Sequence, residues 1–64
     1  MKVKDIAKHM NNYGTNPRIE VHENNHDYFR IIYEGSPYNV SEEIAAKKIN
    51  SFTVRGVGFI EIYV

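Results

Sequence analysis

Residues 18–34 read RIEVHENNHDYFRIIYE, and this stretch decides the fold. Residues 18–23 alternate between polar and apolar side chains, while residues 28–34 are rich in β-branched and aromatic ones. Both patterns are typical of strands. The four residues between them, Asn24 to Asp27, are of types that favour turns. The stretch therefore predicts an antiparallel β-hairpin with one half-buried face.

The same alternation predicts the register of this hairpin. Val21 and Phe29 share a face only if the numbers of paired positions add up to an even sum, because side chains alternate strictly along a strand. A three-residue loop over 24–26 meets this condition and places Val21 opposite Phe29. It also places Glu20 opposite Arg30, an opposite-charge pair that stabilises a hairpin by about 0.2–1 kcal/mol.

Ahead of the hairpin, apolar side chains recur three and four positions apart, which predicts an amphipathic helix. The stripe consists of Val3, Ile6, Ala7, Met10 and Tyr13. Gly14 is expected to end this helix, because glycine readily takes the left-handed conformation that follows a last helical turn. Pro17 then prevents the helix from resuming.

A second, shorter helix is predicted over residues 42–49. Ser41 is a favourable N-cap, and the glutamates at 42 and 43 lie in the first turn, where the helix dipole stabilises negative charge. Lys47 and Lys48 lie in its last turn, where positive charge is favoured.

The C-terminal part predicts a second hairpin, with strands over 51–55 and 59–64 joined by a three-residue loop over 56–58. Hairpin loops of this length are common when one residue takes the left-handed conformation. The pairs predicted by the same parity are Val54 with Ile60 and Phe52 with Ile62.

The sequence thus predicts one two-layer α+β domain over residues 1–64, with element order αββαββ. We expect a four-stranded, mainly antiparallel sheet with two helices on one face, and the strand order stays open. The predicted inner face holds Ile19, Val21, Phe29, Ile31, Tyr33, Phe52, Val54, Ile60, Ile62 and Val64. The predicted outer face holds Arg18, Glu20, His22, Tyr28, Arg30, Ile32, Glu34, Thr53, Arg55, Phe59, Glu61 and Tyr63.

Composition narrows the class of protein. The 64 residues carry eight Lys and Arg against eight Asp and Glu, so the formal net charge is zero. This balance argues against nucleic acid and anionic membranes as partners, and it does not oppose self-association. The chain has no cysteine, no secretory signal pattern and no apolar run of the length of a membrane span. We therefore expect a cytoplasmic protein.

The side chains that carry chemistry are few, and we expect no catalytic residues, no cofactor and no metal. Ser41 is better explained as a helix cap than as a nucleophile. His22 and His26 are four apart, a spacing that places two ligands on one face only in a helix. Here they fall at a strand end and in a turn, so we interpret them as solvated polar residues.

The outer face carries the candidate partner-binding residues, because it places rings, an isoleucine and arginines on an open sheet. They are Tyr28, Arg30, Ile32, Arg55, Phe59 and Tyr63. Aromatic residues and arginine are enriched in protein interfaces, which favours a protein contact or self-association. Stacking of single-stranded bases is the alternative. A third hypothesis is that the rings only cover neighbouring backbone and side-chain stems.

Four short segments resemble small uncharacterised proteins from phages and prophages of Gram-positive bacteria. They are MKVKDI at 1–6, IYEG at 32–35, SEEI at 41–44 and IEIYV at 60–64. Such proteins usually have a proline after the N-cap of the second helix, where this chain has Glu42. The resemblance implies an accessory protein of a mobile element in the cytoplasm. It provides no catalytic residues that could be assigned to positions of this chain.

Together these features predict a non-enzymatic interaction module that associates with itself as a dimer, or binds a host or phage protein. A nucleic-acid-binding accessory protein and a small inhibitor of a host enzyme are the alternatives.

Overall fold

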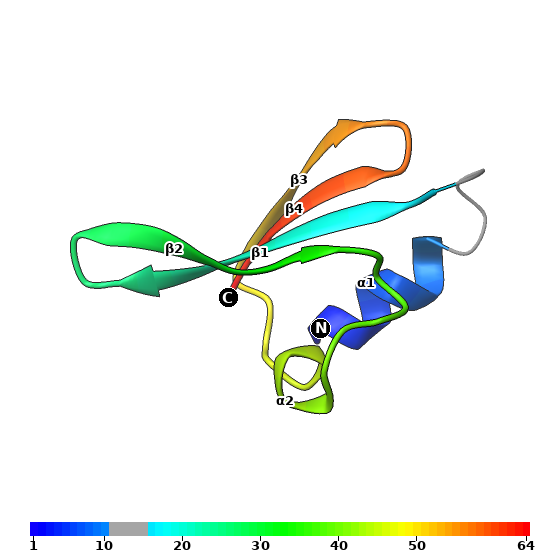
Figure 1. The fold of residues 1–64 in the computed structure, drawn as a ribbon. Helices are drawn as coiled ribbons and strands as arrows, with labels where there is room; N and C mark the ends of the chain where they lie inside the picture. Colours follow the sequence, from blue (N-terminus) through cyan, green and yellow to red (C-terminus); the bar gives the residue numbers. More distant parts are fainter. Residues whose placement is uncertain (11–15) are drawn as a thin grey trace.

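The computed structural model describes residues 1–10 and 16–64. It is an α+β structure with a four-stranded sheet and two helices (Figure 1). The elements along the chain are α1 (Val3–His9), β1 (Arg18–Asn25), β2 (Tyr28–Gly35), α2 (Glu42–Ala45), β3 (Ser51–Gly56) and β4 (Phe59–Tyr63).

The strands lie in the order β2-β1-β4-β3, which the sequence left open. Each hairpin is antiparallel, but the inner strands β1 and β4 run parallel, so the sheet is mixed. The parallel junction places Ile19 beside Ile60 and Val21 beside Ile62. All four side chains are buried. The junction of the two hairpins is therefore also the centre of the core, and hydrophobic burial favours this order of strands.

Helix α1 supplies the other half of that core. Val3, Ile6 and Met10 are buried against the central strands, as their spacing predicts. At the N-terminus of the helix, the backbone N–H of Lys2 donates to Oδ2 of Asp5 at 2.8 Å, which fixes the first turn. α1 ends at His9. The predicted continuation through Tyr13 to the glycine at 14 lies outside the described residues.

The second helix is a single turn, shorter than predicted. The Ser41 cap is confirmed, since its Oγ accepts a hydrogen bond from the backbone N–H of Ile44. The predicted extension to Ile49 is wrong, because the chain instead runs back along the N-terminal segment. There the N–H of Ile49 donates to the carbonyl of Met1 at 2.8 Å, and Lys47 accepts from the N–H of Val3.

The predicted register of the first hairpin is also wrong. Val21 lies opposite Tyr33 rather than Phe29, and Glu20 lies opposite Glu34 rather than Arg30. Two irregularities cause the difference. The turn residues are 26 and 27, with the histidine at 26 in the left-handed conformation at φ +61°. The strand β2 also carries one extra residue opposite the step from position 21 to 22, which is a β-bulge.

The bulge reverses the side of the sheet that each side chain faces in the part of β2 nearest the turn, residues 28–31. Ile32 and Tyr33 both pack against the core, so the alternation of side chains restarts between them. As a result Phe29 and Ile31 leave the predicted inner face. Phe29 is 56% exposed and its ring meets that of Tyr63 edge-on at 5.2 Å, on the side of the sheet away from α1.

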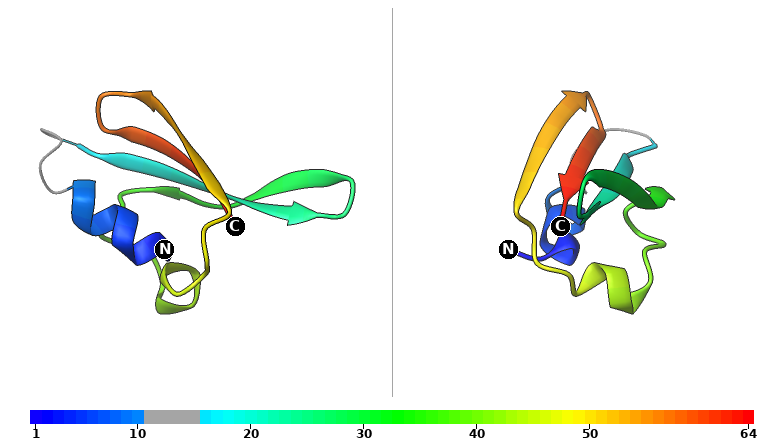
Figure 2. Two further views of the ribbon diagram at one scale, coloured as in Figure 1. Left: turned by 180° about the vertical axis from the view of Figure 1, so that it is seen from behind. Right: turned by 90° about the vertical axis from the view of Figure 1, so that its left-hand side faces the viewer.

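The pairs predicted for the second hairpin are confirmed: Val54 lies opposite Ile60, and Phe52 opposite Ile62. The loop is shorter than predicted, because Gly56 pairs with Phe59 and a bulge falls near residue 55. Phe52 and Val54 nevertheless stay exposed. Helix α1 covers the central strands only, and the β3–β4 hairpin extends beyond it (Figure 2).

Candidate interaction surface

The six residues predicted to bind a partner do not share one face. Arg55, Phe59 and Tyr63 lie on the outer face, away from α1. Arg30 and Ile32 lie on the side of the sheet that α1 covers, called the helix side below. Both also line a recess of about 230 Å³ together with residues that flank and form α2. Alternation along the strand sends Tyr28 to the same side as Arg30. The β2 bulge thus divides the predicted surface, which was built on a regular strand.

On the outer face, a network of hydrogen bonds converges on Glu61. Arg55 donates from Nε to Oε1 of Glu61 at 2.8 Å, and the Tyr63 hydroxyl donates to Oε2 at 2.7 Å. The hydrogen bonds from Arg55 and then from Tyr63 hold the pKa of the Glu61 carboxyl below its usual value. The bond to the Glu61 carboxylate raises the pKa of the Tyr63 hydroxyl.

The outer-face rings also have partners within the chain. The Tyr63 ring lies 5.0 Å from the ring of His22 and 5.2 Å from that of Phe29. The Arg18 guanidinium lies 5.3 Å from the centre of the Phe59 ring, within the range of a cation–π interaction. These contacts favour a structural role for the rings of Phe59 and Tyr63.

All three arginines lie beside carboxylates. Arg18 forms an ion pair with Glu34 at 2.6 Å and a longer one with Glu20 at 3.5 Å, so it bridges two acidic residues that face each other across β1 and β2. Arg30 lies 3.6 Å from Glu23, and Arg55 pairs with Glu61. The positive charge of the arginines is therefore locally neutralised, which weakens the case for nucleic-acid binding through these side chains.

A different surface is left open at the edge strand β3. Among the described strands, β3 is hydrogen-bonded to β4 alone, and all six of its residues are exposed. Its two apolar side chains point to the helix side without being covered: Phe52 is 46% exposed and Val54 is 60% exposed. The free edge of such a strand presents unpaired backbone N–H and C=O groups beside an apolar strip.

Sequence reasoning missed this surface because it placed both side chains under the helices. The structure gives the reason, which is the length of the observed helix α1. A helix of about seven residues is only about 10 Å long, and strands lie about 4.8 Å apart. One such helix cannot cover four strands along their whole length.

The opposite edge, β2, is less open to pairing. The bulge interrupts its ladder with β1 in the middle of the strand, and bulges discourage the addition of a further strand. By contrast, β3 is regular from Ser51 to Val54, and its irregularity falls only near the turn.

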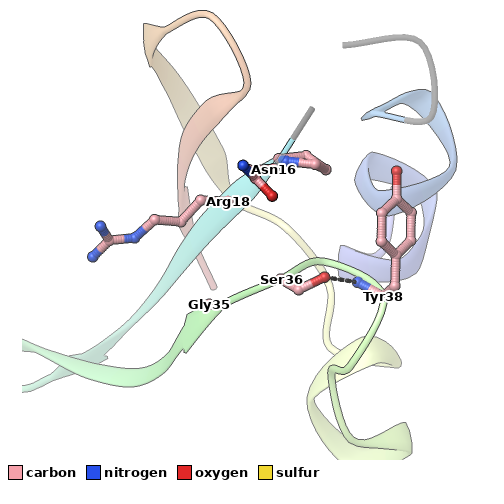
Figure 3. Close-up of a pocket in the computed structure, with 6 residues that line it drawn as sticks. Asn16, Arg18, Gly35, Ser36 and Tyr38 are labelled. Carbon is pink, nitrogen blue, oxygen red and sulfur yellow. Dashed lines mark hydrogen bonds between the residues drawn. The ribbon is translucent and has the colours of Figure 1, made fainter. Parts of the chain in front are cut away.

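Another recess lies where β1 begins and β2 ends, and measures about 490 Å³ (Figure 3). Ser36 Oγ accepts a hydrogen bond from the N–H of Tyr38, and the Arg18 side chain points away toward Glu34. Within residues 1–10 and 16–64, no group of three or more His, Asp or Glu side chains is placed to hold a metal ion. His22 contacts Glu20 at 3.2 Å, whereas His26 lies in the β1–β2 turn.

Comparison of the chain with protein-family models, with curated proteins and with solved structures finds no match. In the part of the chain that the structure describes, neither helix has the length or the apolar character needed to cross a membrane.

Proposed function

We propose that the protein is a non-enzymatic interaction module that self-associates through the edge strand β3. The observation that carries the proposal is the exposure of Phe52 and Val54 beside a strand edge that no other described strand occupies. Burial of that strip would contribute roughly 25 cal/mol for each Å² of apolar surface removed from water. The cost of leaving it exposed makes a partner the simplest explanation for it.

The rest of the surface supports a protein partner over nucleic acid. The formal net charge is zero, and all three arginines lie beside carboxylates. A neutral surface does not repel a second copy of the same chain. Binding of single-stranded nucleic acid needs a positive groove with rings free for stacking, whereas the Phe59 and Tyr63 rings have contacts within the chain.

The biological setting belongs to the proposal as well. The sequence resemblance favours an accessory protein of a phage or prophage, and the lack of cysteine suits a reducing cytoplasm. The proposal takes both helices to lie on one face of the sheet, since Ile44 of α2 packs against the same core as α1. The exposed strip of β3 then lies on that helix side, next to the layer of helices.

Light scattering tests the proposal by giving the molar mass at low and high protein concentration. We expect the mass to rise from monomer toward dimer, and Val54→Lys to keep it at the monomer value. Val57→Lys is the matched control: it makes the same change at the β3–β4 turn, where the side chain is 95% exposed. It should associate like the parent.

A chain that stays monomeric at about millimolar concentration would contradict the proposal. So would a Val57→Lys variant that loses association as fully as Val54→Lys. Binding of single-stranded RNA or DNA that weakens steeply with salt would instead favour the nucleic-acid alternative, because phosphate binding releases counterions.

A further inference from the structure

We infer that two copies of the chain pair antiparallel along β3, with Thr53 opposite Thr53 of the second copy, and form one continuous eight-stranded sheet. This inference rests on the proposed self-association and adds its geometry. A two-fold axis perpendicular to the sheet would pass between the two Thr53 residues. Each copy would then present the same strand to the other, as a closed symmetric dimer requires.

Parity narrows the choice of register. Directly opposite residues of an antiparallel pair point to the same face, so Phe52 and Val54 of both copies share the helix side only if paired positions add up to an even number. The even sums to compare are 104, 106 and 108, which pair three, five and five residues of β3 with the second copy. The sum of 106 is the one centred on Thr53.

The sum of 106 is also the only one of the three that places both apolar residues opposite apolar residues. It pairs Phe52 with Val54 of the second copy, twice by symmetry. The sum of 104 would place Val54 opposite Asn50, and the sum of 108 would place Phe52 opposite Gly56. Aromatic and β-branched side chains form favourable cross-strand pairs, as do two threonines. The strand is therefore complementary to itself when reversed.

The outer face is compatible with this pairing. The regular part of the strand, residues 51–54, carries no charged side chain, so no like charges meet there in this register. The Arg55 guanidinium also stays within its own chain, because it donates to Glu61 with Nε and Nη2. On the helix side, four apolar side chains from Phe52 and Val54 would form one strip at the centre of the joined sheet.

The size of the contact predicts a weak, reversible dimer. Stable interfaces bury at least about 1,200 Å² in total, and two strands of six residues bury less than that. Backbone hydrogen bonds supply much of the affinity when a strand adds to a sheet. We therefore expect exchange between monomer and dimer at micromolar or higher concentration.

A single engineered cysteine tests the register, since the chain has no cysteine of its own. Thr53→Cys should form a disulfide-linked dimer under mild oxidation, because residues directly opposite lie within the Cα separation of about 4.4–6.8 Å that a disulfide needs. Ser51→Cys is the control. In this register the two Ser51 residues are offset by four positions, or about 13 Å along the strands, and should not cross-link.

The outcomes separate the two proposals. If Thr53→Cys cross-links at least tenfold faster than Ser51→Cys, the inferred register holds. If the parent chain forms dimers by light scattering but Ser51→Cys cross-links as fast or faster, the register is wrong while self-association stands. If the parent chain is monomeric, the proposed function fails and the register with it. Equal, slow cross-linking of both variants would indicate random collision and would also overturn the inference.

Discussion

Glu61 is the carboxylate on which the polar contacts of the outer face converge. Hydrogen bonds from Arg55 and Tyr63 hold its pKa below the ordinary value of 4.5. A lowered pKa stabilises the fold above the unfolded-state value, and this contribution is lost as the pH falls through the folded-state value. We therefore expect Glu61→Gln to lower the melting temperature at neutral pH. The difference from the parent should shrink steadily below about pH 4.5.

Melting followed by circular dichroism across this pH range checks the prediction. Glu43→Gln is a suitable control, since it removes an exposed carboxylate from α2 and leaves the Glu61 network intact. If both variants track the parent in parallel at every pH, the hydrogen bonds to Glu61 contribute nothing to stability.

The outer-face ring of Phe59 stabilises the fold through contacts within the chain rather than through a partner. Its ring lies under the Arg18 guanidinium, whose ion pair with Glu34 holds it in place. An exposed cation–π contact contributes about 0.5–1 kcal/mol, and Phe59 is half-buried. We expect Phe59→Ala to destabilise the chain by about 1–2 kcal/mol and to leave its oligomeric state unchanged. Urea unfolding together with light scattering measures both, and loss of the dimer in a folded variant would return Phe59 to the candidate interface.

At the scale of elements, α1 determines what the sheet can bury. It contributes Val3 and Ile6 to the core and is followed by the buried C-cap residue Met10, whereas α2 contributes no buried residue. Truncation of a buried isoleucine to alanine costs about 2–5 kcal/mol, and a domain of this size has little stability to lose. We expect Ile6→Ala to unfold most of the chain near 37 °C. Lys4→Ala, on the exposed side of the same helix, should melt within a few degrees of the parent.

The elements show why sequence reasoning succeeded in some places and failed in others. The buried residues of α1 were predicted from periodicity, the Ser41 cap from its residue type and the Val54–Ile60 pair from strand parity, and each of these is a local pattern. The β2 bulge has no such pattern: Ile32 and Tyr33 are as good in a regular strand as in a bulged one. Together with the turn at 26 and 27, that one extra residue places Phe29 on the other face of the sheet and divides the predicted site.

The strand order depended on contacts between distant segments. Nothing local to β1 or β4 specifies that they run parallel, and only the shared burial of Ile19, Val21, Ile60 and Ile62 selects that arrangement. The open edge at β3 is the consequence of this order combined with the short α1. It could be predicted only once both were known.

For the whole molecule, association and stability must be linked if β3 pairs with a second copy. A dimer that forms only from folded chains stabilises the fold by mass action. Above the dissociation constant, free folded monomer rises with the square root of total concentration. Each tenfold increase should therefore add about 0.7 kcal/mol per chain, half of the roughly 1.4 kcal/mol for a simple ligand. For a domain of this size that is a rise in melting temperature of about 3–5 °C.

We expect this rise for the parent chain and for Val57→Lys, but not for Val54→Lys, whose charge would lie in the apolar strip of the dimer. The measurement is thermal unfolding at about 10, 100 and 1,000 µM, with the mass determined on the same samples. A melting temperature independent of concentration in the parent, at concentrations where light scattering shows a dimer, would mean that the chains associate without stabilising the fold. Pairing through an ordered β3 requires the folded sheet, so that result would exclude the edge strand as the contact.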